Sequence, residues 1–216
     1  MRELFEAIKG GHRERIRKLV QTSPEALLER HHGATPVLFA KYVDQQGAVE
    51  ELLSLAPVLS PFEAAAVGSL PALEAAIRAE PAAVRQLSED GWTVLHLAAF
   101  FGQGACVEAV LQHGGDPKAI SGNALRNTPL HAAAARNHTE VCAALLGHGS
   151  DPDARQQGGY TALHAAAQHG NEVLVDALLA AGATAALVDD QGKDAAQHAA
   201  EAGHAALAAR LRKPRA

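Results

Sequence analysis

The feature that most constrains this chain is a short motif that returns at a nearly fixed interval. Thr-Pro-Leu-His-Ala-Ala begins at Thr128, and Thr-Ala-Leu-His-Ala-Ala begins 33 residues later at Thr161. A third version, Thr-Val-Leu-His-Leu-Ala, begins at Thr93. A repeat of this length is typical of small helical units that cannot bury their apolar faces alone and therefore stack on their neighbours. Function is expected on the surface of that stack.

The motif resembles that of the ankyrin repeat family, and the resemblance is specific from about Gly91 to His204. It implies an all-α solenoid of helical hairpins with about seven units, the N-terminal ones irregular. We expect one domain over residues 1–216, with degenerate units over 1–90, regular units over 91–204, and a C-terminal cap and tail over 205–216. The expected units are anchored by an alanine near the middle of each first helix, at Ala7, Ala40, Ala64, Ala98, Ala133, Ala166 and Ala199.

The N-terminal half departs from the regular repeat pattern in several ways. The step from Ala40 to Ala64 is only 24 residues, which predicts that the hairpin linking these units is missing or collapsed. Residues 1–58 also look like a duplicated two-unit block, because Phe5-Glu6-Ala7 returns 57 residues later as Phe62-Glu63-Ala64. The segments 23–30 and 80–87 are expected to add extra helical turns.

Local chemistry predicts where the helices begin and turn. Thr93, Thr128 and Thr161 stand at helix N-cap positions, and Asp194 replaces Thr in the last unit. Ser60-Pro61-Phe62-Glu63 has the pattern of a capping box. The chain is expected to reverse between the two helices of a unit at residues that tolerate a left-handed conformation, namely Gly102, Asn137, Gly170 and Gly203.

Composition and charge indicate what the core is made of, which partners are not expected, and where in the cell the protein is expected to act. With 48% hydrophobic residues but 4% aromatic residues, the core must be built from Ala, Leu and Val. A net charge of −5 gives no overall attraction to nucleic acid or anionic membrane, and the basic clusters over 13–18 and 210–215 are interpreted as solvated ends of the stack. We expect a cytoplasmic protein without a signal peptide or membrane span, in which Cys106 and Cys142 are buried thiols.

The twelve histidines invite a metal-binding interpretation. In the ankyrin family the motif histidine, here His96, His131 and His164, bonds the neighbouring backbone and ties one unit to the next. The remaining histidines form no compact ligand pattern, so no metal or other cofactor is expected. His113 and His148 occupy equivalent points of adjacent units, which leaves a metal or small-molecule sensor using surface histidines as the alternative function.

Catalysis is not expected either. Cys106 has no His or Asn placed by a recognisable motif, and Gly10-Gly11 and Gly158-Gly159 do not have the context of a phosphate-binding loop.

Most of the few aromatic residues of this chain fall at positions that, in ankyrin repeat proteins, contact a binding partner. By resemblance these positions are the residue before each cap and the two residues after the Ala-Ala pair, which line the concave face. The resulting candidate partner-binding residues are Tyr42, Trp92, Phe100, Phe101, Asn127, Arg136, Tyr160, Gln168 and His169. Five of them, Tyr42, Trp92, Phe100, Phe101 and Tyr160, are aromatic, a type enriched at protein interfaces. We therefore expect a non-catalytic, monomeric module that binds a protein or peptide, unless the chain's own loops cover Tyr42 and Phe100.

Overall fold

The computed structural model describes residues 2–55 and 58–212, and these residues form fourteen α-helices and no β-strand. The helices follow one another as seven pairs, which confirms the predicted all-α solenoid. The first helices of the pairs are α1 (Arg2–Lys9), α3 (Pro36–Tyr42), α5 (Pro61–Val67), α7 (Val94–Phe100), α9 (Pro129–Ala135), α11 (Ala162–Gln168) and α13 (Ala195–Glu201). The second helices are α2 (Arg13–Thr22), α4 (Gln46–Leu55), α6 (Leu70–Ala79), α8 (Gly104–Gln112), α10 (Thr139–Gly147), α12 (Glu172–Ala180) and α14 (Ala205–Leu211).

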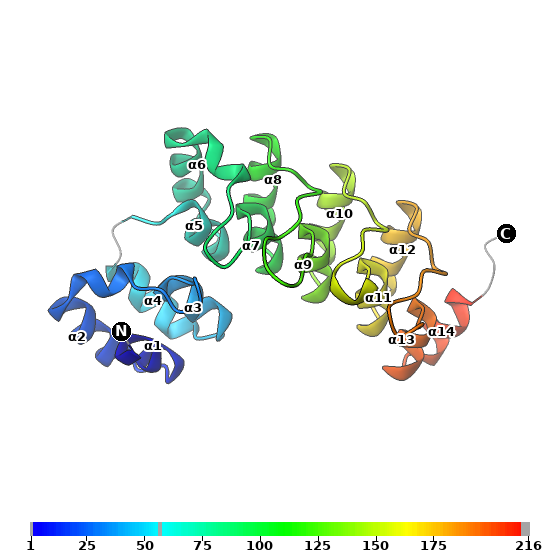
Figure 1. Ribbon diagram of the computed structural model, residues 1–216, viewed down its shortest axis with the longest axis horizontal. Coiled ribbons are helices and arrows are strands. Elements are labelled where there is room, and N and C mark those ends of the chain that lie inside the picture. Colours follow the sequence, from blue (N-terminus) through cyan, green and yellow to red (C-terminus); the bar gives the residue numbers. More distant parts are fainter. Residues whose placement is uncertain (1, 56–57, 213–216) are drawn as a thin grey trace.

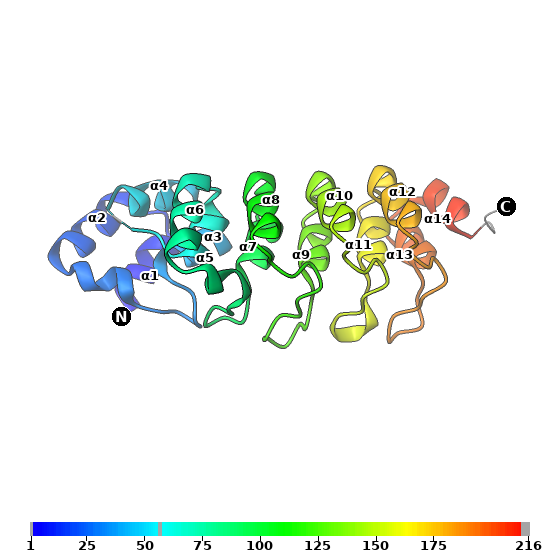
Figure 2. The same ribbon diagram turned by 90° about the horizontal axis from the view of Figure 1, so that it is seen from above.

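The pairs stack side by side in two layers. Figure 1 shows the odd-numbered helices from α5 to α13 in one row and the even-numbered helices from α6 to α12 in a second row beside it. The connecting hairpins leave the helices on one side of the stack (Figure 2). The pairs α1–α2 and α3–α4 are set to one side of the line of the other pairs (Figure 1). The array is therefore regular from α5 onwards and displaced before it.

The helices begin at the predicted caps. The Thr93 hydroxyl accepts a hydrogen bond of 3.2 Å from the N–H of His96. Ser60 and Glu63 form the predicted capping box, and Asp194 caps α13 with its carboxylate. Because the first N–H groups of a helix have no partner within the helix, these side chains supply the missing acceptor. The predicted reversals are confirmed as well, with left-handed φ values of 72° at Gly102 and 61° at Asn137.

The predicted irregularities of the N-terminal half are also present. The two extra helical turns form 3₁₀-helices, η1 over Pro24–Leu28 and η2 over Pro81–Arg85. They follow α2 and α6 at a separation of 57 residues, which fits the inferred duplication. Only residues 56–60 connect α4 to α5, so the hairpin expected to be missing is missing.

Small residues let the first helices of neighbouring units approach closely. All seven anchor alanines are 0% exposed. Since interiors pack at nearly crystalline density, a larger side chain at these positions would force the helices apart. The buried leucines and valines of the second helices fill the remaining space, as in α8, where Val107 and Val110 are fully buried.

Motif histidines tie each regular unit to the next. Their Nε2 atoms lie within hydrogen-bond distance of the carbonyl oxygen that precedes the next cap, 2.9 Å for His96 and Asn127, 3.1 Å for His131 and Tyr160, and 3.2 Å for His164 and Lys193. Each first helix is therefore bonded to the following hairpin, and the role expected from the family resemblance is confirmed.

The helix-reversing turns form a second line of contacts between units. The ring of His138 packs so closely on Gly102 that a Cβ there would lie 2.7 Å from it. One unit further along, the Asn171 side-chain amide donates a 2.7 Å hydrogen bond to the Asn137 side-chain oxygen. Each turn thus supports the turn of the next unit.

The junction between the second and third units is built differently. The second unit has Leu38 at the position of the motif histidine. Its side chain cannot form a hydrogen bond, so this unit lacks the histidine bond to the next hairpin and is joined to the array by other contacts. Here the hairpin before α3 packs directly on the hairpin before α7, and a Cβ on Gly33 would lie 2.8 Å from the backbone nitrogen of Asp90. The Tyr42 hydroxyl donates a 2.7 Å hydrogen bond to Asp90 Oδ2. The second unit is therefore tied across the missing hairpin to the fourth.

A separate hydrophobic cluster fills this junction. We call it the seam cluster; its buried members are Ala34, Leu38, Ala66, Trp92, Leu97 and Ala132, and Phe39, Tyr42, Phe62, Phe100 and Phe101 pack against it, partly buried. It lies between the core of the first two units and the core of the regular array, which are separate clusters. Aromatic packing thus joins the displaced N-terminal block to the rest of the stack.

Candidate partner-binding surface

The candidate contact residues come from two places in each unit. One is the hairpin tip just before the cap, and the other is the C-terminal end of the odd-numbered helix, as at Phe100, the last residue of α7. We call the surface formed by these positions the inner face. Because capped helices and bonded hairpins hold both places, the inner face is a pre-organised surface.

Trp92 is the least accessible of the aromatic candidates, at 8% exposed. Its ring lies 5.2 Å from that of Phe100 in an edge-to-face arrangement. It belongs to the seam cluster, where the tryptophan of one hairpin tip fills the space between the second and fourth units. This matches the alternative in which the chain's own segments cover part of the aromatic set, and the structure assigns Trp92 a packing role.

Tyr42, Phe100 and Phe101 remain partly exposed above this buried base. The Phe100 and Phe101 rings lie 5.0 Å apart, and the ring of Tyr42 lies 5.6 Å from that of Phe101. Burial and the bond to Asp90 raise the pKa of the Tyr42 hydroxyl well above its ordinary value, so the group stays protonated and continues to donate. We call these three partly exposed rings the seam patch.

Two cations lie over the seam patch. Lys41 Nζ is 4.7 Å from the centre of the Phe101 ring, and the guanidinium carbon of Arg136 is 5.2 Å from that of Phe100. Both distances lie within the range of a cation–π interaction. Sequence reasoning selected Arg136 but missed Lys41, which directly precedes a selected position, Tyr42, in the last turn of α3.

Asn127 is 4% exposed, and both its backbone N–H and its carbonyl form hydrogen bonds within the protein. The carbonyl accepts the bond from His96, and the N–H donates to Ser121 Oγ at 3.1 Å. The side-chain Oδ1 is buried without a hydrogen-bond partner. The structure thus places Asn127 beneath the inner face, where it holds the hairpin.

Further along the inner face the side chains are polar. Tyr160, Gln168 and His169 form what we call the polar strip. The Tyr160 hydroxyl donates a 2.6 Å bond to Gln168 Oε1, and His169 Nε2 lies 3.1 Å from the Ala135 carbonyl oxygen. Gln168 and His169 are exposed, and Tyr160 is half-buried. Burial raises the pKa of Tyr160 to about 12, so its hydroxyl remains a donor.

The motif histidines are neutral structural groups. Burial lowers the pKa of His96 to about 4, and it lowers the pKa values of His131 and His164 in the same direction. Hydrogen bonds to backbone carbonyls oppose this effect without cancelling it. An uncharged imidazole can still donate to the next hairpin through one ring nitrogen.

The two surface histidines of the alternative function, His113 and His148, have separate partners. His113 Nδ1 lies 2.8 Å from the Ala109 carbonyl oxygen, whereas His148 Nε2 lies 3.2 Å from Glu108 Oε2. His198 pairs with the buried carboxylate of Asp189 at 2.8 Å. Within residues 2–55 and 58–212, no group of three or more His, Cys, Asp or Glu side chains could hold a metal ion.

Neither cysteine has the surroundings of a nucleophile. Cys106 and Cys142 are free and buried in the second helices α8 and α10. Burial raises the pKa of both thiols, to about 12 for Cys142. Since the thiolate is the reactive form, these side chains behave as small hydrophobic groups.

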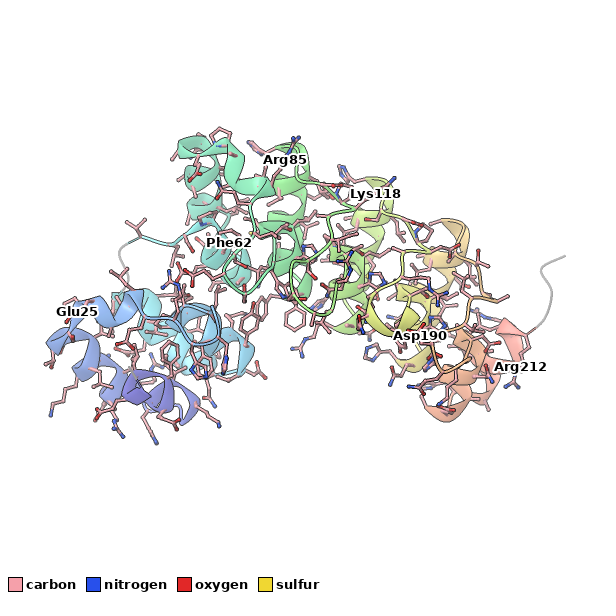
Figure 3. All side chains as sticks on the ribbon, viewed as in Figure 1. Glu25, Phe62, Arg85, Lys118, Asp190 and Arg212 are labelled. Atoms are coloured by element: carbon pink, nitrogen blue, oxygen red, sulfur yellow. The ribbon has the colours of Figure 1, made fainter. Side chains whose placement is uncertain are left out.

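Arginines of both basic clusters form ion pairs within the protein. Arg17 binds the buried carboxylate of Glu51 through two hydrogen bonds of 2.7 and 2.9 Å, which lower the pKa of that carboxyl group. At the other end Arg210 pairs with Asp176 at 3.0 Å. Arg212 points outward nearby (Figure 3), whereas Lys213 and Arg215 lie outside the described residues. The paired arginines support the interpretation of these clusters as ends of the stack.

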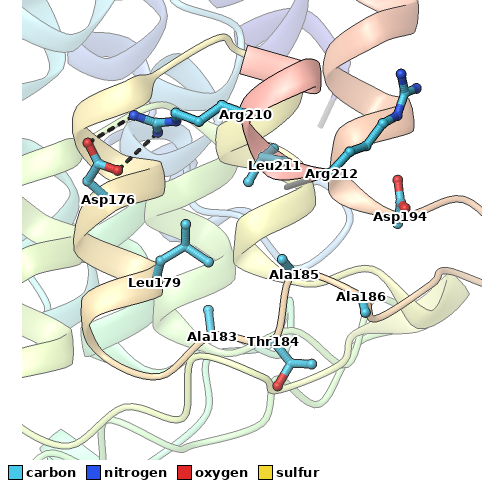
Figure 4. A pocket seen from close by; sticks show the side chains of 10 residues that line it. All are labelled: Asp176, Leu179, Ala183, Thr184, Ala185, Ala186, Asp194, Arg210, Leu211 and Arg212. Atoms are coloured by element: carbon cyan, nitrogen blue, oxygen red, sulfur yellow. Dashed lines mark hydrogen bonds and ion pairs between the residues drawn. The ribbon is translucent and has the colours of Figure 1, made fainter. Parts of the chain in front are cut away.

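The ion pair of Arg210 closes one side of a cavity of about 640 Å³ between α12, α14 and the last hairpin (Figure 4). Most of its other walls are alkyl groups, such as Leu179 and Ala185. Its other carboxylate, Asp194, is the cap of α13. A second hollow, an apolar groove of about 850 Å³, is lined by Leu28, Leu55 and Val58 beside the shortened link between α4 and α5. Neither hollow assembles a set of catalytic side chains.

The family comparison agrees with this geometry. The model described as "Ankyrin repeats (3 copies)" matches residues 62–156 and 145–215. The chain belongs to the ankyrin repeat family. The matched range begins at Phe62, in the first unit after the missing hairpin, so the part of the repeat array outside the match is the part that packs irregularly.

Similarity to individual ankyrin repeat proteins covers shorter stretches. The chain is 42% identical over 79 residues to NF-kappa-B inhibitor alpha from Homo sapiens, which is 36% of this chain and 25% of that protein. It is 40% identical over 76 residues to Ankyrin repeat and SOCS box protein 18 from Homo sapiens, covering 35% of this chain and 16% of that protein. For ARF GTPase-activating protein Git from Drosophila melanogaster, identity is 44% over 54 residues, covering 25% and 7%. The matches therefore span a minor part of each relative.

No helix in the described part of this ankyrin repeat chain has the length and apolar character needed to cross a membrane.

Proposed function

We propose that this chain is a non-catalytic protein-binding module that recognises a protein or peptide partner on the concave face of the solenoid, the surface described above as the inner face. The observation that carries the proposal is the seam patch together with the polar strip. Partly exposed Phe100 and Phe101 provide apolar anchors, while Arg136, Gln168 and His169 are exposed groups able to form hydrogen bonds. Aromatic and arginine side chains are the types that dominate interface energetics.

The similarity to NF-kappa-B inhibitor alpha supports the same function, because that protein's name describes action on another protein. Two buried free thiols are compatible with the reducing cytoplasm, which is the location we propose. We propose that the chain acts as a monomer and does not bind nucleic acid, since the net charge is −5 and Arg17 and Arg210 are paired.

The test compares two alanines of the same unit. Ala135 is exposed at the end of α9 on the inner face, and Ala143 is exposed on α10 in the second layer. Partners are captured from a lysate on the wild-type chain and on Ala135→Trp and Ala143→Trp variants. Partners that bind the inner face should be lost from Ala135→Trp and kept by Ala143→Trp. If the captured proteins are the same on all three chains, the inner face is not the binding surface.

A further inference from the structure

The two positive charges over the seam patch lack a directly paired carboxylate among the described residues. Neither Lys41 nor Arg136 has an ion pair within 4.0 Å among the described residues. Other inner-face cations do: Lys193 Nζ lies 2.7 Å from Glu201 Oε2. The seam patch therefore holds two cations without a directly paired carboxylate, although the charge of Asp44 acts on Lys41 and Asp90 is bonded to Tyr42.

The two cations come from distant units and lie over two adjacent rings, Lys41 over Phe101 and Arg136 over Phe100. Lys41 is in α3 of the second unit, and Arg136 follows α9 in the fifth. Burial is the main cause that lowers the pKa of Lys41; the negative charge of Asp44 opposes it, and the smaller effect of the positive charge of Arg136 adds to the lowering. An anion bound beside the two cations would relieve their mutual repulsion. It would also compensate Lys41 for the hydration that this side chain loses through burial.

The rings supply the other half of the site. Phe100 and Phe101 meet edge to face at 5.0 Å, with an interplanar angle of 87°, so each contributes a different part of its surface to the patch. Their outer surfaces are partly exposed, whereas Ala66 of the third unit is buried beneath them in the seam cluster. An apolar side chain of a partner can pack on these exposed ring surfaces, next to Lys41 and Arg136.

We propose that the seam patch binds an acidic segment of a partner protein, with an aromatic or aliphatic side chain packed on Phe100 and Phe101 and carboxylates paired with Lys41 and Arg136. The inference rests on the proposed function and names the chemistry of its partner. Charge complementarity argues for this occupant, because neither cation has a carboxylate within ion-pair distance among the described residues. A nucleic acid is disfavoured, since tight binding to its phosphates needs many more cations than two.

The test uses short random peptides displayed on phage and selected on the wild-type chain. Enriched peptides should carry Asp or Glu next to an aromatic or aliphatic residue. Synthetic versions with a fluorescent label are then titrated against wild type and a Lys41→Glu plus Arg136→Glu variant. Affinity should fall at least about tenfold and should weaken with added salt. A matched control is Lys118→Glu, an exposed lysine on a connecting loop (Figure 3), which should change affinity by less than about twofold.

A second variant guards against misfolding. Lys41→Met plus Arg136→Met keeps unbranched aliphatic chains over the rings and removes both charges, so it should also lose affinity while melting near the wild-type temperature. Enrichment of basic or neutral peptides, no enrichment at all, equal affinity in the charge variants, or tighter binding of a single-stranded thymidine oligonucleotide would each overturn the inference. Some selected peptides could fail to bind Ala135→Trp and yet bind the charge variants as tightly as the wild type. That result would support binding on the inner face and would refute the proposal of an acidic partner.

Discussion

Acidification should destabilise this protein through His96. The side chain is 0% exposed, and Nε2 is bonded to the Asn127 carbonyl. Its pKa is about 4 in the folded chain, against an ordinary value of 6.5, because burial disfavours the charged ring. At pH values between these two, the unfolded chain binds a proton that the folded chain does not. The contribution of His96 to stability is therefore complete above about pH 6.5 and is lost as the pH falls towards about 4.

The size of the loss follows from the same two pKa values. Between about pH 7.5 and about pH 5, protonation of the unfolded chain at His96 should lower the unfolding free energy by about 2 kcal/mol, and the full loss at lower pH is about 3 kcal/mol. The assay is urea unfolding followed by circular dichroism at several pH values, for wild type and His96→Gln. Glutamine does not titrate, and its amide can donate to the same carbonyl.

His131 and His164 titrate in both proteins, so their contributions largely cancel in the comparison. The wild type should lose about 2 kcal/mol more than His96→Gln over this range. His148→Gln, which changes an exposed histidine, should follow the wild type. Parallel pH profiles for wild type and His96→Gln would refute the claim that burial keeps this imidazole neutral.

Three further predictions follow from burial and hydrogen bonding. Trp92 should emit at blue wavelengths in the free protein, and Trp92→Ala should cost about 3–5 kcal/mol of folding free energy measured by urea unfolding; emission like that of free indole would contradict its place in the seam cluster. His131→Ala should cost about 1–3 kcal/mol in the same assay, and His148→Ala less than about 0.5 kcal/mol, because only His131 leaves buried partners unpaired; equal losses would contradict this. Hydrogen exchange should show stronger amide protection in α7–α12, where the motif histidines tie neighbouring units, than in α1–α4, since array stability depends on contacts between neighbours; uniform protection would contradict this expectation.

Much of the fold could be predicted because its signals are local. Caps such as Ser60 and Asp194, and turns such as Gly102, follow from single residues and their neighbours. The missing hairpin could be predicted because it changes a spacing. The anchor alanines could be located because the motif repeats.

The candidate surface was harder to predict because exposure depends on packing between distant segments. Trp92 occupies a hairpin tip, as Tyr160 does, yet the missing hairpin brings the second unit against it and buries it. Asn127 is buried for another reason, since its backbone serves the histidine tie. Lys41 was overlooked because its importance depends on Phe101, 60 positions away in the chain. A contact between two side chains on either side of an irregular junction leaves no recognisable sequence pattern in either segment alone.

The most direct test of the account is a map of where a partner touches the solenoid. Gln168 lies exposed on the inner face at the end of α11, and Gln112 lies exposed at the end of α8 in the second layer. A photo-crosslinking amino acid is placed at each position in turn, and the captured partner is added. The account predicts an adduct from position 168 and none from position 112. An adduct from position 112 alone would show that the partner binds the second layer, and would contradict the inner face as the binding surface.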